Sequence, residues 1–466
     1  MRKTKIICTI GPETSTYPML EKLAAAGMDV VRLNMSHGEH ETAARVIKFI
    51  KTLNRKIAYP IAILLDTQGP EIRTGDLAND LELKNGSIIT ISVRDTKVEE
   101  SSIHINYDEL VDTVDVGDRI TVDNGIINLK VLHKNESGTM QCEVIDGGIL
   151  KSKRHVNLPG IRVNLPAITK KDKEDILFAV EQQVDFIALS FVREAQDIRD
   201  LNDLIGDRAG KIKVIAKIED QSGVQNLVEI LDEADGIMVA RGDLGVEINV
   251  AELPNVQRRI VQQCAEKGKR VIVATHLLES MIENPIPTRA EVTDVANAIY
   301  EEVDAVMLSG ETTIGQHPVR CVEQLVEIAE ATESFTGLNF TQKLHGGDEK
   351  QLLAITAVQL AERLEAKGIV VITRRGFMAD YVTNCHPQKT RIYAFTNDSR
   401  TRRRLMLNRN LSPFRSEFSN DPEKTLQTAL DLLKARASVG PGDKVVVISD
   451  VLAGVGIDAV QIREIP

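Results

Sequence analysis

The 466-residue sequence contains no tryptophan and few aromatic residues of any kind. Aromatic side chains make up only 3% of the chain, whereas hydrophobic residues as a whole make up 42%. The core must therefore be built mainly from Val, Ile, Leu and Ala. Because proteins hold single-stranded nucleic acid by stacking its bases on aromatic rings, this shortage argues against that class of ligand.

The chain also lacks an excess of positive charge. Its 57 Lys and Arg residues are outnumbered by 68 Asp and Glu residues, which gives a formal net charge of −11. A molecule of this sign presents no overall basic surface to a polyanion such as nucleic acid. A small anion could still bind to a local cluster of Arg and Lys.

Paired cysteines and long apolar segments are absent as well. The five cysteines lie far apart and form no CxxC pair, which is typical of free thiols in a reducing compartment. No segment approaches the ~20 apolar residues of a membrane span. The opening MRKTKIICTIGPET is too poor in apolar residues for a secretory signal. We expect a cytoplasmic protein.

The first two thirds of the chain contain a series of short apolar segments rich in β-branched residues. Such segments are typical of strands buried on both faces of a parallel sheet, and amphipathic stretches such as 171–183 and 256–267 lie between them. Roughly eight strands alternating with helices predict an α/β fold, a (β/α)8 TIM barrel, with an open doubly wound sheet as the alternative. The segments begin at Thr4, Val30, Ile61, Phe186, Lys213, Gly236, Arg270 and Ala305.

Residues 71–167 interrupt this succession of strands and helices. Their apolar and polar residues alternate, and the turn sequences Asn85-Gly86 and Asp123-Asn124-Gly125 predict β-hairpins. We therefore predict an all-β domain, a β-barrel inserted after the third strand of the TIM barrel. Because barrel active sites lie at the ends of those strands, the insert is placed to act as a lid that excludes water.

The last part of the chain predicts a separate open α/β domain. A helix from Leu352 precedes three further apolar strands, after a polar stretch at 343–350. The tract TRRRLMLNR from Thr401 is interpreted as a solvated helix face, with an anion-binding segment as the alternative. The predicted domains are the TIM barrel at 1–70 and 168–342, the lid at 71–167, and the C-terminal domain at 343–466.

Candidate functional residues follow the predicted strands, since the active site of a TIM barrel forms where its strands end. Cations, carboxylates and small hydroxyls are expected to meet at this rim, a composition that suits phosphate and a divalent metal ion. The candidates are Arg32, Asn34, Ser36, Asp66, Thr67, Lys217, Glu219, Gly242, Asp243, Thr275 and Ser309, with Arg73 just inside the insert.

The carboxylates Glu219 and Asp243 are hard oxygen ligands of the kind that Mg²⁺ prefers. A glycosidase-like acid/base pair is the alternative, but the neighbouring cations Lys217 and Arg32 would lower a carboxyl pKa. Lys217 and Glu219 are two residues apart on one strand and so share a face. The segment His37–His40 lacks the helical spacing of a zinc site, and no GxxxxGK[ST] phosphate loop occurs.

Six segments of the sequence resemble pyruvate kinase, and the resemblance covers nearly the whole chain. It implies transfer of the phosphoryl group of phosphoenolpyruvate to ADP, giving pyruvate and ATP in glycolysis, with Mg²⁺ (or Mn²⁺) and K⁺ as cofactors and a homotetrameric assembly. The segments are RLNMSHG at Arg32, LDTQGPEIRTG at Leu65, VIAKIED at Val214, IMVARGDLGVEI at Ile237, VATHLLESMI at Val273 and MLSGETTIG at Met307.

The resemblance also implies roles for individual residues. Lys217, Arg73 and the metal ions would stabilise the charge that develops during transfer, and Ser309 would help to relay a proton. Glu71 is the residue found in members that need K⁺. The implied ligand contacts are Glu219 and Asp243 for Mg²⁺; Asn34, Ser36, Asp66 and Thr67 for K⁺; Arg32, Lys217, Gly242, Asp243 and Thr275 for phosphoenolpyruvate; and Asn34, His37, Arg73 and Lys171 for the nucleotide.

Two single positions and one loop depart from the family pattern. Gln68 and His276 replace residues common in relatives, which bears on substrate affinity. In the C-terminal domain the loop Thr373-Arg374-Arg375-Gly376-Phe377-Met378 has few of the hydroxyl donors that hold fructose 1,6-bisphosphate in many members. Thr373, Arg374 and Arg375 are therefore predicted to bind a different anionic effector, such as a sugar monophosphate or AMP.

Two alternative functions fit the sequence less well. Another TIM-barrel enzyme acting on enolates, of the aldolase or phosphoenolpyruvate mutase type, needs neither an inserted lid nor the LDTQGPEIRTG segment. A non-catalytic paralogue that only binds an effector would be expected to lose Lys217, Glu219 or Asp243, and all three are present.

Overall fold

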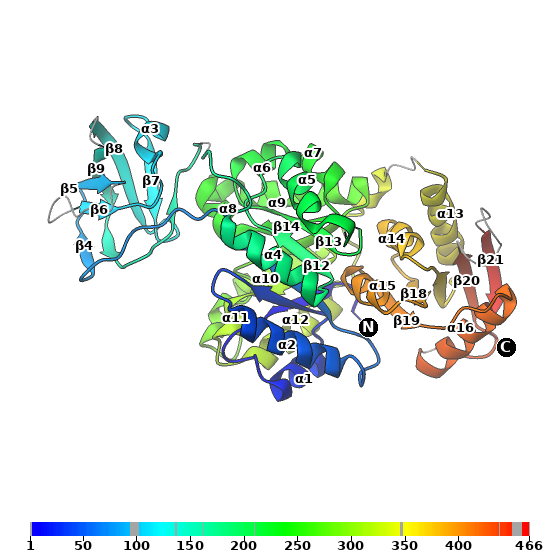
Figure 1. Cartoon of the computed structure of the whole chain (residues 1–466). Coiled ribbons are helices and arrows are strands. Elements are labelled where there is room, and N and C mark those ends of the chain that lie inside the picture. Colours follow the sequence, from blue (N-terminus) through cyan, green and yellow to red (C-terminus); the bar gives the residue numbers. More distant parts are fainter. Residues whose placement is uncertain are drawn as a thin grey trace.

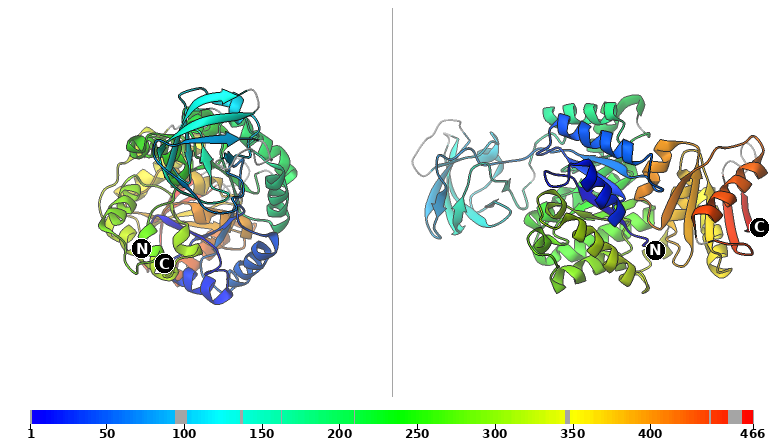
Figure 2. Two further views of the ribbon diagram at one scale, coloured as in Figure 1. Left: turned by 90° about the vertical axis from the view of Figure 1, so that its left-hand side faces the viewer. Right: turned by 90° about the horizontal axis from the view of Figure 1, so that it is seen from below.

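The computed structural model describes residues 2–93, 102–135, 138–161, 163–208, 210–344, 348–437, 439–449 and 459–465. A central barrel lies between two smaller domains, with the inserted domain at one end and the C-terminal domain at the other (Figure 1). Viewed from the inserted domain, helices form a ring around the barrel (Figure 2). No helix among these residues is long and apolar enough to cross a membrane.

Eight parallel strands form the closed central barrel, in the order β1-β16-β15-β14-β13-β12-β3-β2. This confirms the predicted TIM barrel and rules out the open sheet. Nearly every strand residue is buried, because alternate residues face the barrel interior and the surrounding helices. The strands are β1 (Lys5–Thr9), β2 (Val30–Asn34), β3 (Ala62–Asp66), β12 (Phe186–Leu189), β13 (Lys213–Ile218), β14 (Gly236–Ala240), β15 (Arg270–Ala274) and β16 (Ala305–Leu308).

The helices around the barrel bury their apolar faces against the outward-facing strand residues. The two helical stretches named from the sequence correspond to α4 and α9. The helices are α1 (Tyr17–Ala26), α2 (His40–Leu53), α4 (Lys170–Gln182), α5 (Ala195–Ile205), α6 (Gln221–Gln225), α7 (Leu227–Glu233), α8 (Arg241–Glu247), α9 (Leu253–Lys267), α10 (Arg289–Tyr300), α11 (Gly310–Thr313) and α12 (Pro318–Thr332).

The inserted domain follows β3 and has a hydrophobic core of its own. Its strands form a six-stranded sheet, β11-β7-β8-β9-β5-β6, and a separate two-stranded sheet, β10-β4. Neither sheet closes on itself within the described residues, so the predicted β-barrel form is not observed. The elements are β4 (Leu81–Leu83), β5 (Ile88–Ser92), β6 (Ser102–His104), α3 (Leu110–Thr113), β7 (Arg119–Val122), β8 (Ile127–Asn135), β9 (Thr139–Asp146), β10 (Gly148–Leu150) and β11 (Val156–Asn157).

One of the two predicted hairpins in this domain is correct. The turn at Asp123-Asn124-Gly125 joins β7 to β8, which pair antiparallel. The hairpin predicted at Asn85-Gly86 is wrong, because β4 pairs with β10 and β5 pairs with β9 and β6. The Asn85 side chain instead accepts a hydrogen bond of 2.8 Å from the amide of Gly147, next to β10.

The C-terminal domain is an open α/β sheet in the order β19-β18-β17-β20-β21, in which only β21 runs antiparallel to its neighbour. Its location agrees with the sequence analysis, whereas the bounds given there for the three domains stay a prediction. The elements are α13 (Glu349–Arg363), β17 (Gly368–Ile372), α14 (Phe377–Asn384), β18 (Arg391–Thr396), α15 (Ser399–Arg404), β19 (Leu411–Arg415), α16 (Pro422–Arg436), β20 (Lys444–Ser449) and β21 (Ala459–Glu464).

The arginine tract at the start of TRRRLMLNR is not a solvated helix face. It lies in α15, where the Arg403 Nε donates hydrogen bonds of 2.9 and 3.1 Å to the two carboxylate oxygens of Asp185. Asp185 is fully buried just before β12, and a buried carboxylate requires a partner of opposite charge. The tract therefore docks the C-terminal domain against the end of the barrel opposite the insert.

Candidate active site

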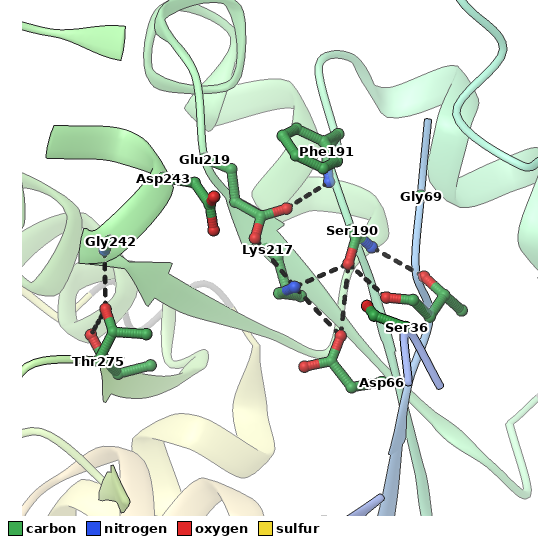
Figure 3. Close-up of polar contacts among 12 residues, drawn as sticks. Ser36, Asp66, Gly69, Ser190, Phe191, Lys217, Glu219, Gly242, Asp243 and Thr275 are labelled. Atoms are coloured by element: carbon green, nitrogen blue, oxygen red, sulfur yellow. Dashed lines mark hydrogen bonds and ion pairs between the residues drawn. The ribbon is translucent and has the colours of Figure 1, made fainter. Parts of the chain in front are cut away.

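A buried cluster of opposite charges lies where the barrel strands end on the side of the inserted domain (Figure 3). The Lys217 ammonium, near the end of β13, is 2.9 Å from Glu219 Oε1 and 3.1 Å from Asp66 Oδ1. It also donates a hydrogen bond of 2.7 Å to Ser190 Oγ. Burial alone lowers the pKa of Lys217, but Asp66 and Glu219 outweigh this effect and raise it. The lysine is therefore held in its charged form.

Asp66, the last residue of β3, joins Lys217 to a second cation. The Arg32 Nε donates a hydrogen bond of 2.6 Å to Asp66 Oδ2, and the same guanidinium bonds to Thr9 Oγ1 at 3.0 Å. Burial raises the pKa of Asp66, but Arg32 and Lys217 together hold it below its usual value. The site thus contains two fixed positive charges bridged by one ionised carboxylate.

Glu219 and Asp243 form the carboxylate part of the site. Burial raises the pKa of Glu219 to about 7, against the opposing effect of Lys217, and the pKa of Asp243 is raised by burial as well. Among the described residues, no three His, Cys, Asp or Glu side chains form a complete metal cage. Two carboxylate donors nevertheless fit Mg²⁺, which completes its coordination with water and substrate oxygens.

Thr275 and Gly242 lie across the barrel mouth from Lys217 (Figure 3). The Gly242 amide, in the first turn of α8, donates a hydrogen bond of 2.7 Å to Thr275 Oγ1. Thr275 and His276 both have positive φ, 68° and 54°, a conformation that costs free energy in residues other than glycine.

The side chain of Arg241 holds this strained turn in place. Its Nη2 donates to the carbonyl oxygens of Thr275 at 2.7 Å and His276 at 3.2 Å, and its Nε donates to that of Ala274 at 3.3 Å. Asp294 pairs with the same guanidinium at 2.8 Å. Arg241 is 7% exposed, so it positions the turn through buried bonds to the backbone of the turn.

A cavity of about 680 Å³ opens beside the charged cluster and is lined by Arg32, Asn34, His37 and Ser309. Ser309 follows β16, and its amide donates a hydrogen bond of 2.7 Å to Glu311. Its buried Oγ forms no hydrogen bond with any described residue, which leaves it free for a ligand. Asn34 Oδ1 accepts a hydrogen bond of 3.2 Å from the Ser36 amide.

Other predicted site residues have partners outside the cluster. Arg73 pairs with Glu71 at 2.6 Å and donates to the Lys153 carbonyl of the inserted domain at 2.9 Å. Lys171, at the start of α4, bonds to the Met35 carbonyl at 2.6 Å. Both residues lie at the rim of the mouth.

The Thr67 and Thr373 hydroxyls are both engaged within the protein. Thr67 is buried, and its Oγ1 accepts a hydrogen bond of 3.0 Å from the Ser190 amide. Thr373 is also buried, and its Oγ1 accepts one of 3.1 Å from the Gly376 amide. Arg374 and Arg375 are exposed and lie just before α14, which belongs to the domain at the end of the barrel opposite the inserted domain (Figure 1).

Several residues of the site were missed by the sequence analysis. Ser190 bonds to Lys217, and the amide of Phe191 donates a hydrogen bond of 2.7 Å to Glu219 Oε2. Both directly follow the apolar segment of β12, so the strand-end argument would have found them. The inserted domain contributes His155, whose Nδ1 is 3.9 Å from Asp243 Oδ1, and nothing in the sequence indicated this contact.

A parallel eight-stranded barrel with cations and carboxylates at the ends of its strands defines an enzyme of the TIM-barrel class. Two family models match the chain, "Pyruvate kinase, barrel domain" over residues 1–322 and "Pyruvate kinase, alpha/beta domain" over residues 351–462. The chain belongs to the pyruvate kinase family, and it is a phosphotransferase of that type.

Curated relatives match almost the whole chain. A pyruvate kinase of Geobacillus stearothermophilus is 43% identical over 97% of this chain and 78% of its own length. The chloroplastic pyruvate kinase isozyme G of Nicotiana tabacum is 42% identical over 96% of this chain and 80% of its own length. A Staphylococcus aureus pyruvate kinase is 39% identical over 97% of this chain and 78% of its own length.

Proposed function

We propose that the barrel mouth transfers the phosphoryl group of phosphoenolpyruvate to ADP, with Lys217 as the principal catalytic cation. The observation that carries the proposal is the buried Lys217 ammonium, which is held between Asp66 and Glu219 within 3.1 Å of both carboxylates. As the phosphoryl group leaves, negative charge develops on the transferred oxygens and on the enolate oxygen. A preorganised cation in a water-poor site stabilises that charge in the transition state.

The substrates are assigned to the two sides of the mouth. Phosphoenolpyruvate would contact Arg32 and Lys217 on one side and the Gly242–Thr275 turn on the other. Asn34 and His37, which line the 680 Å³ cavity, would receive the nucleotide together with Lys171 and Arg73. Ser309, whose buried Oγ has no hydrogen-bond partner among the described residues, would take part in the transfer of a proton to the enolate.

Two kinds of metal ion belong to this proposal. Glu219 and Asp243 would hold Mg²⁺ (or Mn²⁺), and their donor set fits a hard divalent cation. Oxygen atoms of Asn34, Ser36, Asp66 and Thr67 would hold K⁺. When bound, these ions supply positive charge that offsets the charge of the phosphates.

The homotetramer, the cytoplasmic location and the anionic effector at Thr373, Arg374 and Arg375 stay predictions. Thr373 is buried, and its hydroxyl oxygen accepts a hydrogen bond from the Gly376 amide. The exposed Arg374 and Arg375 would therefore supply most of the contacts to such an effector.

The test is a coupled assay of pyruvate formation from phosphoenolpyruvate and ADP with Mg²⁺, with and without K⁺. We expect Lys217→Met to keep its fold by circular dichroism and to lose about 100-fold or more in kcat, as for loss of one preorganised transition-state donor. Lys173→Met, at an exposed lysine of α4, is the matched control and should retain wild-type turnover. Near-normal turnover in Lys217→Met would contradict the assignment of Lys217.

A further inference from the structure

Lys171, at the rim of the barrel mouth, is paired with a buried carboxylate that the proposed reaction does not use. Its ammonium lies 2.8 Å from Asp175 Oδ2, one turn further along α4. The Lys171 side chain is 45% exposed, whereas that of Asp175 is only 3% exposed. Burying a carboxylate is costly unless charged or hydrogen-bonding groups compensate it, so Asp175 depends on its partners.

The second partner of Asp175 is His40, the first residue of α2. The His40 Nε2 lies 2.6 Å from Asp175 Oδ1. Because a carboxylate oxygen can only accept a hydrogen bond, we assign the imidazole proton to Nε2, which donates to Asp175. The two oxygens of this one carboxylate are therefore divided between donors on two different helices.

The imidazole of His40 is itself held by an aromatic neighbour. It stacks on the ring of Phe178 in α4, with ring centroids 4.4 Å apart and an angle of 7° between the ring planes. Phe178 and Asp175 share a face of α4, because they have the i, i+3 spacing of helical neighbours. The half-exposed His40 is thus fixed by stacking on its face and by a hydrogen bond at its edge.

The Lys171 ammonium has a further partner outside α4. It donates a hydrogen bond of 2.6 Å to the carbonyl oxygen of Met35. Met35 follows β2 and stands between Asn34 and Ser36, and it lines the 680 Å³ cavity assigned to the nucleotide. One carboxylate and one carbonyl therefore fix the ammonium beside that cavity.

We propose that Asp175 and His40 are positioning residues, which hold the Lys171 ammonium in place to meet the phosphates of ADP. This inference rests on the proposed function, which assigns Lys171 to the nucleotide. A lysine has a long flexible stem, and ordering it on a ligand costs conformational entropy. Because Asp175 orders the side chain before ADP binds, less of that entropy is lost on binding and the affinity for ADP is higher.

Asp175→Asn tests the carboxylate. Asparagine keeps the size of the side chain but loses the charge that attracts Lys171. Isothermal titration of ADP with Mg²⁺ into the full-length protein should show Kd raised about tenfold, as for loss of one charged hydrogen bond. In the assay of pyruvate formation, KM for ADP should rise by a similar factor, while kcat and KM for phosphoenolpyruvate change less than about twofold. The matched control is Glu174→Gln, which removes an exposed carboxylate from the same helix and should leave Kd within about twofold.

Two substitutions at His40 separate its hydrogen bond from its stacking. His40→Phe keeps a ring on Phe178 but has no N–H group for Asp175, and we expect it to weaken ADP binding about threefold, since Asp175 still contacts Lys171 directly. His40→Gln retains a donor and should recover most of this loss. A merely structural role would lower Tm in His40→Phe without changing the ratio of KM for ADP to KM for phosphoenolpyruvate.

Lys171→Met, alone and combined with Asp175→Asn, decides whether Asp175 acts through Lys171. We expect Lys171→Met to weaken ADP binding and Asp175→Asn to add little to it, because no ammonium is left to position. The inference is overturned if the two effects add in full, if only Lys171→Met weakens binding, or if neither does. Pyruvate formation by the wild type would leave the proposed function standing in each of these cases. A wild type that forms no pyruvate would instead refute the proposed function, and the titrations would still decide this inference.

Discussion

At the scale of single residues, Glu71 determines how Arg73 is held at the rim of the active site. Their ion pair measures 2.6 Å, and Gln68 bonds to the same carboxylate oxygen at 3.0 Å. Burial raises the pKa of Glu71, but the hydrogen bond and charge of Arg73 outweigh it and hold the pKa below its usual value. Glu71 is therefore a fixed negative charge, and it is bonded to Gln68, the residue that follows Thr67 of the proposed K⁺ site.

Glu71→Lys should make turnover less dependent on K⁺. The substituted ammonium places a positive charge where the carboxylate stood, so the monovalent cation has less to contribute. We expect the ratio of kcat with and without K⁺ to fall by roughly tenfold, the scale of one electrostatic contribution in such a site. Glu71→Gln, which removes the charge without reversing it, is the control, and an unchanged K⁺ requirement in Glu71→Lys would refute the prediction.

Sequence reasoning located Lys217, Glu219 and Asp66 because the ends of parallel barrel strands meet whatever their order along the chain. It could not find Arg241, whose side chain acts on the backbone of a different strand, or His155, which arrives from the inserted domain. Contacts of this kind depend on how elements pack together. Strand pattern alone does not specify that packing.

At the scale of elements, the turn after β15 depends on the start of α8. Arg241 there donates to the carbonyl oxygens of two consecutive residues with positive φ, and one of them, Thr275, accepts the Gly242 amide. Each such residue stores about 1–3 kcal/mol of backbone strain. The turn that faces the substrate is thus maintained by a side chain that we expect never to touch it.

Arg241→Lys should therefore weaken substrate binding more than it slows the chemical step. A lysine has its three N–H groups on one nitrogen and lacks the planar guanidinium that reaches the carbonyls and Asp294 from separate nitrogens, so we expect KM for phosphoenolpyruvate to rise about tenfold while kcat changes less. Arg199→Lys is the matched control, since Arg199 of α5 pairs with Glu233 of α7 and takes no part in the bonds that hold this turn. If kcat fell and KM stayed constant, Arg241 would not be a positioning residue for the turn.

The elements themselves show where local patterns lose their predictive value. Asp123-Asn124-Gly125 predicted its hairpin correctly, because β7 and β8 are neighbours both in sequence and in the sheet. Asn85-Gly86 carries an equally strong turn signal, yet β4 pairs with β10 far along the chain. A turn sequence fixes the local reversal of the backbone but not the partner of each strand.

At the scale of the whole molecule, the inserted domain and the barrel are joined by a hydrogen bond to a buried carboxyl group. Asn157 of β11 donates a hydrogen bond of 2.8 Å to Glu247 at the end of α8. Burial raises the pKa of Glu247 to about 7, despite this hydrogen bond. Its usual value is near ~4.3, so between these limits the folded protein binds more protons than the unfolded chain, and stability falls as pH rises.

Glu247→Gln should remove the loss of stability that accompanies ionisation of Glu247 as the pH rises. Glutamine resembles the protonated carboxyl group and keeps an acceptor for Asn157, so the variant should be more stable than wild type by about 1–3 kcal/mol at pH 8. At pH 5, which is still above the unfolded value of about 4.3, the stability difference should shrink to roughly a third of its size at pH 8. Differential scanning calorimetry at both pH values checks this, with the exposed Glu252→Gln as control. A Tm difference that is the same at both pH values would contradict the proposed cause.

The position of the inserted domain also has a consequence for how the chain folds during synthesis. In the barrel β3 pairs with β12, although the whole insert separates them in sequence, and closing a flexible loop of that length is costly in entropy. The insert has its own core and brings its two ends together, with the Val156 amide bonded to the Ile72 carbonyl at 2.8 Å. Until it folds, β3 is the open edge of a growing sheet, exposed to pairing with other chains. The speed at which the insert folds should therefore set how long the nascent chain is vulnerable to aggregation.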